Sequence, residues 1–163
     1  MTAAQIVDRR AFRNALGCFA TGVTVVTTVT DAGEPVGLTA NSFSSVSLDP
    51  PLVLFCLGRN SQNFEAITAA GRFAVNVLAE EQRDLSVRFS TAIGDRWDGV
   101  AWETWETGAP ILSGCLASLD CETEAVHDGG DHVIMVGRVK RLASVSEGKP
   151  LLYFMGNYAT VEG

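Results

Sequence analysis

The pattern of apolar and polar residues predicts one leading helix followed by strands. From Val7 to Phe19 the apolar side chains follow a helical i, i+4, i+5, i+8 spacing with arginines opposite, as in an amphipathic helix. Residues 23–30 are almost all β-branched, and such side chains favour a strand because their χ1 angle is already restricted. The turn residues 31–34 then lead into residues 35–39, so a hairpin is expected.

The middle of the chain begins with a proline pair that excludes a helix. After it, residues 52–57 are continuously apolar, which predicts a strand buried on both faces. A helix is expected over residues 62–70, with Asn60 or Ser61 as its cap and a glycine at its C-terminal end.

The second half of the chain is rich in strand signals. A turn with two consecutive glycines, residues 127–131, separates two β-rich runs that should form the longest hairpin. The expected elements are strands at residues 73–78, 116–126 and 132–145, a helix at residues 80–89, and a long connection at residues 91–108.

At least six strands with hairpin connections and few helices favour a mainly β fold, an antiparallel barrel closed so that no edge is left unpaired. A doubly wound sheet fits poorly. The chain has no G-x-G-x-x-G after a strand and no G-x-x-x-x-G-K-[ST], so it carries neither a Rossmann fingerprint nor a P-loop.

Composition narrows the classes of function. A chain of 163 residues fits one domain, residues 1–163. With 19 acidic and 12 basic residues the net charge is −7, which disfavours nucleic acid and anionic membranes as partners. No apolar run reaches the ~20 residues of a membrane span, and residues 1–10 lack the apolar core of a secretory signal. A soluble, cytoplasmic protein is expected.

Cysteines and histidines are few. Cys18, Cys56, Cys115 and Cys121 form no CxxC pair and are expected to be reduced and mostly buried. His127 and His132 span a glycine turn and do not form a metal-ligand pair on one helix face, so no metal site is expected. Without a G-x-S-x-G motif, a serine hydrolase is disfavoured as well.

The most informative segment is residues 38–53, which join two apolar strands through small hydroxyl and amide residues. Such a segment lets backbone N–H groups approach a flat polar ligand and supplies hydroxyl donors and acceptors. Arg59, Ser61 and Asn63, before the next helix, offer a positive charge and capping groups for a phosphate. An ordinary exposed helix cap is the alternative interpretation of Arg59 and Ser61.

Three motifs in order, residues 39–53, residues 72–78 and Gly130-Asp131-His132, resemble the short-chain flavin reductases, the small components of two-component flavin-dependent monooxygenases. The resemblance extends from Phe12 to Tyr158. It implies a split β-barrel of the FMN-binding type, antiparallel and Greek-key-like with a few peripheral helices, and a homodimer. It also implies reduction of FMN or FAD by NADH or NADPH, and delivery of reduced flavin to a separate monooxygenase.

The resemblance implies a role for each matching position. Residues 39–45 would line the isoalloxazine and ribityl chain, and His132 would contact the nicotinamide as the catalytic residue. Phe89 and Tyr158 match aromatic positions near flavin or nicotinamide in relatives, although core or dimer packing would explain them equally well. The implied cofactor-binding residues are Thr39, Ala40, Asn41, Ser42, Phe43, Ser44, Ser45, Arg59, Ser61, Asn63, Phe89, Gly130, Asp131, His132 and Tyr158.

Two functions from different classes stay open at this stage. The first is an NAD(P)H:flavin oxidoreductase, in which alignment and stacking of two rings matter more than covalent chemistry. The second is a split-barrel flavoprotein that retains its flavin as a binding or electron-transfer module, or reduces a non-flavin substrate. The tryptophans Trp97, Trp102 and Trp105 are assigned to a lid or to packing. The choices of FMN or FAD, of NADH or NADPH, and of partner oxygenase are left undetermined.

Overall fold

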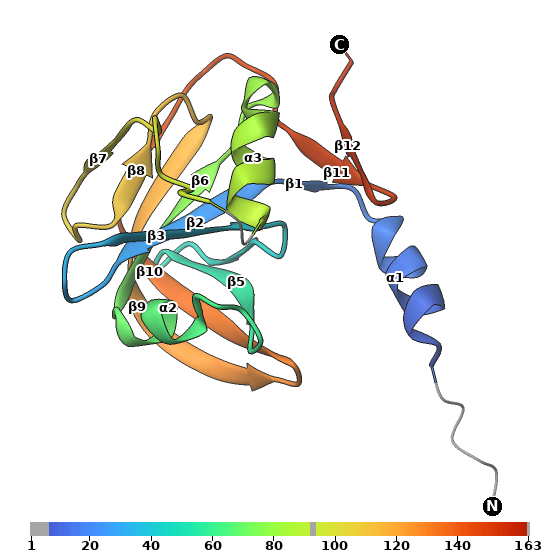
Figure 1. Cartoon of the computed structure of the whole chain (residues 1–163), viewed down its shortest axis with the longest axis horizontal. Coiled ribbons are helices and arrows are strands. Elements are labelled where there is room, and N and C mark those ends of the chain that lie inside the picture. The colour runs from blue at the N-terminus through green and yellow to red at the C-terminus, as the bar shows by residue number, and fades with distance from the viewer. Residues whose placement is uncertain (1–6, 92–93, 163) are drawn as a thin grey trace, which may run out of the picture.

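The structure is a computed structural model that describes residues 7–91 and 94–162. Helix α1 (Arg9–Gly17) begins at Asp8, whose carboxylate accepts a hydrogen bond of 2.9 Å from the Ala11 amide. The helix stands beside the β-rich body, next to the last hairpin (Figure 1). The predicted leading helix is confirmed, but none of its residues is buried.

Seven antiparallel strands form the main sheet, in the spatial order β3-β2-β6-β9-β10-β5-β4. The expectation of a mainly β, antiparallel fold is thereby confirmed (Figure 1). The strands are β2 (Thr24–Val29), β3 (Pro35–Ala40), β4 (Ser44–Ser47), β5 (Leu52–Gly58), β6 (Arg72–Val77), β9 (Ala117–Gly129) and β10 (His132–Ser144).

The sheet does not close on itself through hydrogen bonds in the described residues. Strands β3 and β4 lie at its two ends but are consecutive in the chain, so residues 41–43 alone bridge these edges. The expectation of full closure is therefore wrong, and the architecture fits a split barrel. A three-residue link keeps the two edges near each other at one end without a ladder between them.

Smaller elements surround this sheet. The expected helix at residues 80–89 divides into a 3-10 turn and an α-helix, and the expected connection at residues 91–108 contains a short strand. These elements are β1 (Thr21–Gly22), α2 (Phe64–Ala69), η1 (Glu80–Gln82), α3 (Arg83–Ser90), β7 (Trp102–Thr104), β8 (Pro110–Leu112), β11 (Leu152–Phe154) and β12 (Asn157–Ala159). Strand β1 pairs with the β11–β12 hairpin, and β7 pairs with β8.

Strand β5 corrects the expectation of burial on both faces. Its residues alternate between buried and half-buried, with Val53, Phe55 and Leu57 facing the core. An antiparallel sheet covers only one face with core, and a continuous apolar run cannot show this from the sequence. The second face of β5 is therefore available for further contacts.

The longest hairpin, β9–β10, is confirmed, but its turn is shorter than expected. Gly129 pairs with His132, so only Gly130 and Asp131 form the turn, and Gly130 has a φ of 76°. Two-residue hairpin turns need positive φ angles, which glycine adopts without steric cost. His127 belongs to strand β9.

A buried amide ties four parts of the fold together. Asn76 on β6 is fully buried and donates to the Val25 carbonyl at 3.1 Å. Its side-chain oxygen accepts from the Leu112 amide and from the Ser118 hydroxyl, each at 3.0 Å. One side chain thus joins β2, β6, β8 and β9 in the interior.

All four cysteines lie in the described residues and are free thiols. Burial raises the pKa of Cys121 to about 12 and that of Cys115 to about 11, so both stay protonated at neutral pH. Cys56 is half-buried, whereas Cys18 is exposed, contrary to the expectation for that residue.

Residues 1–6 lie outside the described residues, and with them most of the segment on which the expectation about a secretory signal depends. Within residues 7–91 and 94–162, no helix has the length and apolar content that a membrane crossing requires. The same residues contain no group of three potential metal-ligating side chains.

Candidate functional site

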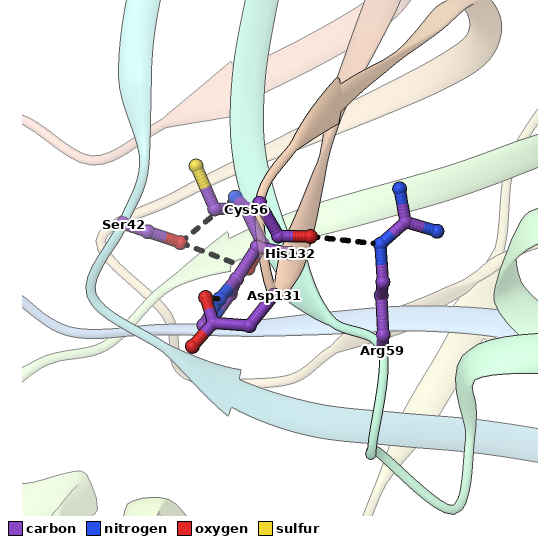
Figure 2. A network of polar contacts seen from close by, with 6 residues as sticks. Ser42, Cys56, Arg59, Asp131 and His132 are labelled. Carbon is purple, nitrogen blue, oxygen red and sulfur yellow. Dashed lines mark hydrogen bonds and ion pairs between the residues drawn. The ribbon is translucent and has the colours of Figure 1, made fainter.

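The link between β3 and β4 is fastened to β5 by one hydroxyl. Ser42 Oγ donates to the Cys56 carbonyl at 3.1 Å and accepts from the Cys56 amide at 2.9 Å (Figure 2). The segment 38–53 is thus not all loop, because residues 44–47 form β4 and pair with β5. The Ser42 hydroxyl fixes the backbone beside β5 and is already occupied by protein groups.

The other predicted residues of this segment divide by exposure. Thr39 donates its hydroxyl proton to the Ser86 carbonyl at 2.6 Å, and Ala40 is a core residue. Phe43 packs against the same core. The exposed side chains, which remain open to a ligand, are Asn41, Ser44 and Ser45.

Arg59 lies against the β9–β10 turn. Its amide donates to the Asp131 carbonyl at 2.9 Å and its Nε donates to the Gly130 carbonyl at 3.0 Å (Figure 2). Its guanidinium also pairs with the Asp128 carboxylate. Arg59 therefore holds the turn that carries His132, a role the sequence did not indicate.

Ser61 and Asn63 shape the start of α2. Ser61 Oγ accepts from the Asn63 amide at 3.2 Å, and Asn63 itself occupies the N-cap position, without a side-chain cap bond. The expectation that Asn60 or Ser61 caps the helix is therefore wrong. The Asn63 side chain instead donates to the Gly37 carbonyl on β3 at 3.3 Å.

His132 stands at the first position of β10, next to the two-residue turn. Its Nδ1 lies 2.7 Å from an Asp131 carboxylate oxygen. An ionised carboxylate only accepts, so Nδ1 donates this hydrogen bond. The hydrogen bond from His132 lowers the pKa of Asp131 and keeps this carboxyl ionised at neutral pH.

The ring of His132 lies close to β5. A Cβ on Gly58 would stand 3.7 Å from His132 Nε2, an ordinary van der Waals distance, which places the imidazole directly beside this strand. Gly58 pairs with His132 and Cys56 pairs with Ile134 on the same two strands. The Ser42 link and the His132 turn therefore meet on β5, although they are far apart in the sequence (Figure 2).

Phe89 and Tyr158 lie on α3 and β12. Phe89 is 1% exposed and packs edge-on against Trp97, with ring centroids 5.0 Å apart. Tyr158 shares a 2.7 Å hydrogen bond with the buried Ser86 hydroxyl. Since the Ser86 carbonyl also accepts from Thr39, this serine joins β12 to β3. Ser86 and Phe89 stand three positions apart on α3 and therefore on the same face of the helix. This spacing is the sequence signal that could have pointed to Ser86.

A groove of about 1020 Å³ lies next to the link between β3 and β4. It lies between α1 and the body, and Asn41, Ser42, Tyr153 and Met155 line its body side. Its other side includes Leu16 of α1 and Phe19 just after that helix, which are 58% and 78% exposed, and Phe12 of α1 is 54% exposed.

The tryptophans in the described part of the connection pack on the body. Trp97 contacts Trp102 edge-on with centroids 5.8 Å apart, in addition to Phe89. Trp105 donates to Glu103 at 2.8 Å and lies under the Arg141 guanidinium, 4.6 Å from its ring centroid. Packing is thus the role the structure gives them.

Comparisons with known proteins identify the family of this chain. Residues 16–162 match the family described as flavin reductase like domain. The chain is 48% identical over 160 residues to the reductase subunit HsaB of a flavin-dependent monooxygenase from Rhodococcus jostii, covering 98% of this chain and 82% of the relative. It is also 48% identical over 151 residues to the FMN reductase (NADH) SmoA of Agrobacterium fabrum, covering 93% and 85%.

Solved structures show the same similarity. The NADH:FAD oxidoreductase SgcE6 of Streptomyces globisporus, in complex with NAD and FAD fragments, superposes with a TM-score of 0.89 and 39% identity, covering 98% of both chains. Nitrilotriacetate monooxygenase component B from Mycobacterium thermoresistibile superposes with a TM-score of 0.91 and 46% identity. That match covers 98% of this chain and 89% of the other.

Proposed function

We propose, from the premise that this chain belongs to the flavin reductase-like family, that its site on β5 is where NADH or NADPH reduces FMN or FAD. The chain is a flavin-reducing oxidoreductase, as its relatives are. The observation that carries the assignment of the site is the meeting of the Ser42 link and the His132 turn on β5.

The residues present fit a flavin. The Ser42–Cys56 bonds hold the link in one place, the exposed Asn41, Ser44 and Ser45 offer polar groups, and Gly58 adds no side chain beneath His132. A bound flavin would supply the ring that accepts the hydride. Donors on the link would stabilise the negative charge of the reduced ring without reorganising.

His132 is proposed to orient the nicotinamide against the flavin. Asp131 fixes the imidazole through Nδ1, and Arg59 fixes the turn through two carbonyl contacts. Hydride transfer needs two rings in close alignment and little proton movement, so positioning accounts for most of the effect. Ser61 and Asn63 are proposed to meet the flavin phosphate, while Arg59 serves mainly the turn.

The function has a direct test by turnover. Purified protein is expected to oxidise NADH or NADPH only when FMN or FAD is added, because the flavin leaves the site after reduction. Absorbance of the nicotinamide is followed with each of the four pairs, and a flavin Kd near or above micromolar is expected. Stoichiometric flavin that copurifies and that neither nicotinamide reduces would instead support the retained-flavin module.

A homodimer is proposed for the assembly. It would cover the exposed apolar side chains at and just after α1, which are Phe12, Leu16 and Phe19. Burial of such side chains is favourable by about 1.5–3 kcal/mol each.

A separate monooxygenase is proposed to receive the reduced flavin. A cytoplasmic location is also proposed, and the free cysteines are compatible with it.

The dimer is tested by one charge on α1. Leu16→Glu is expected to convert a dimer into a monomer, because the new carboxylate would have to be buried unpaired in the interface. Sedimentation velocity measures the assembly state. Val145→Glu, at an exposed aliphatic residue of similar accessibility, is the control and should stay dimeric. A monomeric parent protein, or an unchanged Leu16→Glu dimer, contradicts the assignment of this face.

A further inference from the structure

The start of the link between β3 and β4 is held by two side-chain hydrogen bonds. The Thr39 hydroxyl donates to the Ser86 carbonyl at 2.6 Å. The Ala40 carbonyl accepts from the buried Thr24 hydroxyl at 2.7 Å. Both bonds leave β3 for another element, because Thr24 lies on β2 and Ser86 on α3. The two residues that precede the link are thus positioned by groups from outside their own strand.

Ser86 makes a second contact through its side chain. The residue is fully buried, and its hydroxyl lies 2.7 Å from the hydroxyl of Tyr158 on β12. A hydroxyl both donates and accepts, so either oxygen can supply the proton. Removal of the Tyr158 hydroxyl would leave Ser86 without this partner at a place that bulk water does not reach.

The ring of Tyr158 is held on two sides. The Arg83 guanidinium of α3 lies over it, 5.1 Å from the ring centroid. Tyr153 of β11 packs edge-on against it, with ring centroids 5.5 Å apart. Cation–π contacts and edge-to-face aromatic pairs both favour one orientation of a ring. The contacts with α3 and β11 therefore fix the ring whose hydroxyl meets Ser86.

The last hairpin depends on such side-chain contacts for its position. Its strands β11 and β12 have three residues each. Strand β11 pairs with β1 at two positions, Thr21 with Tyr153 and Gly22 with Leu152. With so short a ladder, a buried side-chain bond to α3 contributes more to placing the hairpin than it would for a long strand.

These contacts connect two parts of the groove at α1. Asn41 and Ser42 of the link line its body side, and so does Tyr153 of the last hairpin. The contacts run from the Tyr153 ring through Tyr158 and Ser86 to β3, which leads directly into the link. The position of the link relative to the last hairpin thus depends on the bond between Ser86 and Tyr158.

We propose that Ser86 and Tyr158 are positioning residues for hydride transfer, acting through Thr39 on the link. The proposal rests on the proposed function, because it takes the link to face the flavin. Neither hydroxyl touches flavin or nicotinamide in this role, which differs from the cofactor contact that the resemblance implies for Tyr158. Hydride transfer depends on the alignment of two rings, and a small displacement caused by distant residues lowers its rate.

The test is a double-mutant cycle on the two hydroxyls. Tyr158→Phe and Ser86→Ala each remove one oxygen and little else. Each is expected to lower kcat at saturating FMN and nicotinamide about tenfold and to raise the Kd of FMN about fivefold. The double variant should be no worse than either single variant, because both oxygens act through one bond. Steady-state kinetics and a fluorescence titration measure the two quantities.

Ser90→Ala is the matched control. Ser90 lies on the same helix, is exposed, and donates its hydroxyl proton to the Val87 carbonyl within that helix. Its replacement should leave kcat and the Kd of FMN near those of the parent protein.

Two results would overturn the proposal. A purely structural role would lower the urea midpoint of the variants while kcat and the Kd of FMN stay unchanged at a temperature where they are folded. Additive losses in the double variant would mean that the Tyr158 hydroxyl acts on a ligand directly.

The proposed function is decided separately, by oxidation of the nicotinamide in the parent protein with FMN. If the parent binds FMN without turnover, that function fails, and the cycle in the Kd of FMN still decides whether Ser86 and Tyr158 position the link.

Discussion

Replacing His132 with alanine is expected to lower kcat/KM for the nicotinamide about 100-fold while the Kd of FMN changes less than twofold. The imidazole is held by Asp131 at 2.7 Å and faces Gly58, so it is placed to orient one ring against the other. Loss of alignment at a reacting centre costs about this much even when displacement is about 1 Å. Steady-state kinetics with varied NADH and a flavin titration measure the two quantities.

The chain offers a matched control for this prediction. His127 lies in the same hairpin, is exposed, and pairs with Ile134 away from the turn. His127→Ala should leave both quantities near those of the parent protein. A large rise in the Kd of FMN with unchanged use of NADH would remove His132 from the nicotinamide side and assign it to the flavin.

Replacing Asn76 with alanine is expected to lower the free energy of unfolding by about 3–5 kcal/mol. The substitution leaves the buried Leu112 amide and Ser118 hydroxyl without their acceptor, and the Val25 carbonyl without one donor. Each unsatisfied buried group costs about 1–3 kcal/mol, and the cavity adds to this cost. Urea unfolding followed by circular dichroism measures the change.

Asn14→Ala is the control for that measurement. Asn14 is exposed on α1, where its replacement should change stability by less than about 0.5 kcal/mol. If Asn76→Ala unfolds at the urea concentration of the parent protein, the buried amide is not the junction that these contacts describe.

Most elements were predictable because their signals are local. The β-branched run before Asp31 forms β2, and two glycines beside Asp131 mark the tip of the longest hairpin. Strand preference depends on neighbouring side chains and turn type on the φ angles of two residues, so both can be seen within a few positions. The boundaries were less accurate, as with the cap of α2, which falls at Asn63.

The partners of polar groups were not predictable in the same way. Thr39, which was expected to line a ligand, bonds to Ser86, and Arg59, which was expected near a phosphate or as an exposed cap, bonds to the hairpin turn. A hydroxyl or guanidinium bonds equally well to a ligand, a carbonyl or a carboxylate. Only the folded backbone determines which of these lies within about 3 Å.

The sequence by itself determined the kinds of element, the family and the three motifs of the candidate site, since these follow from side-chain type and spacing along the chain. Tertiary structure decided that the sheet stays split between β3 and β4, that Ser42 and His132 meet on β5, and that Ser86 joins β12 to β3. The physical reason is distance in the chain. Ser42 and His132 become neighbours only when strand pairing orders the whole sheet, because that pairing depends on burying many side chains together.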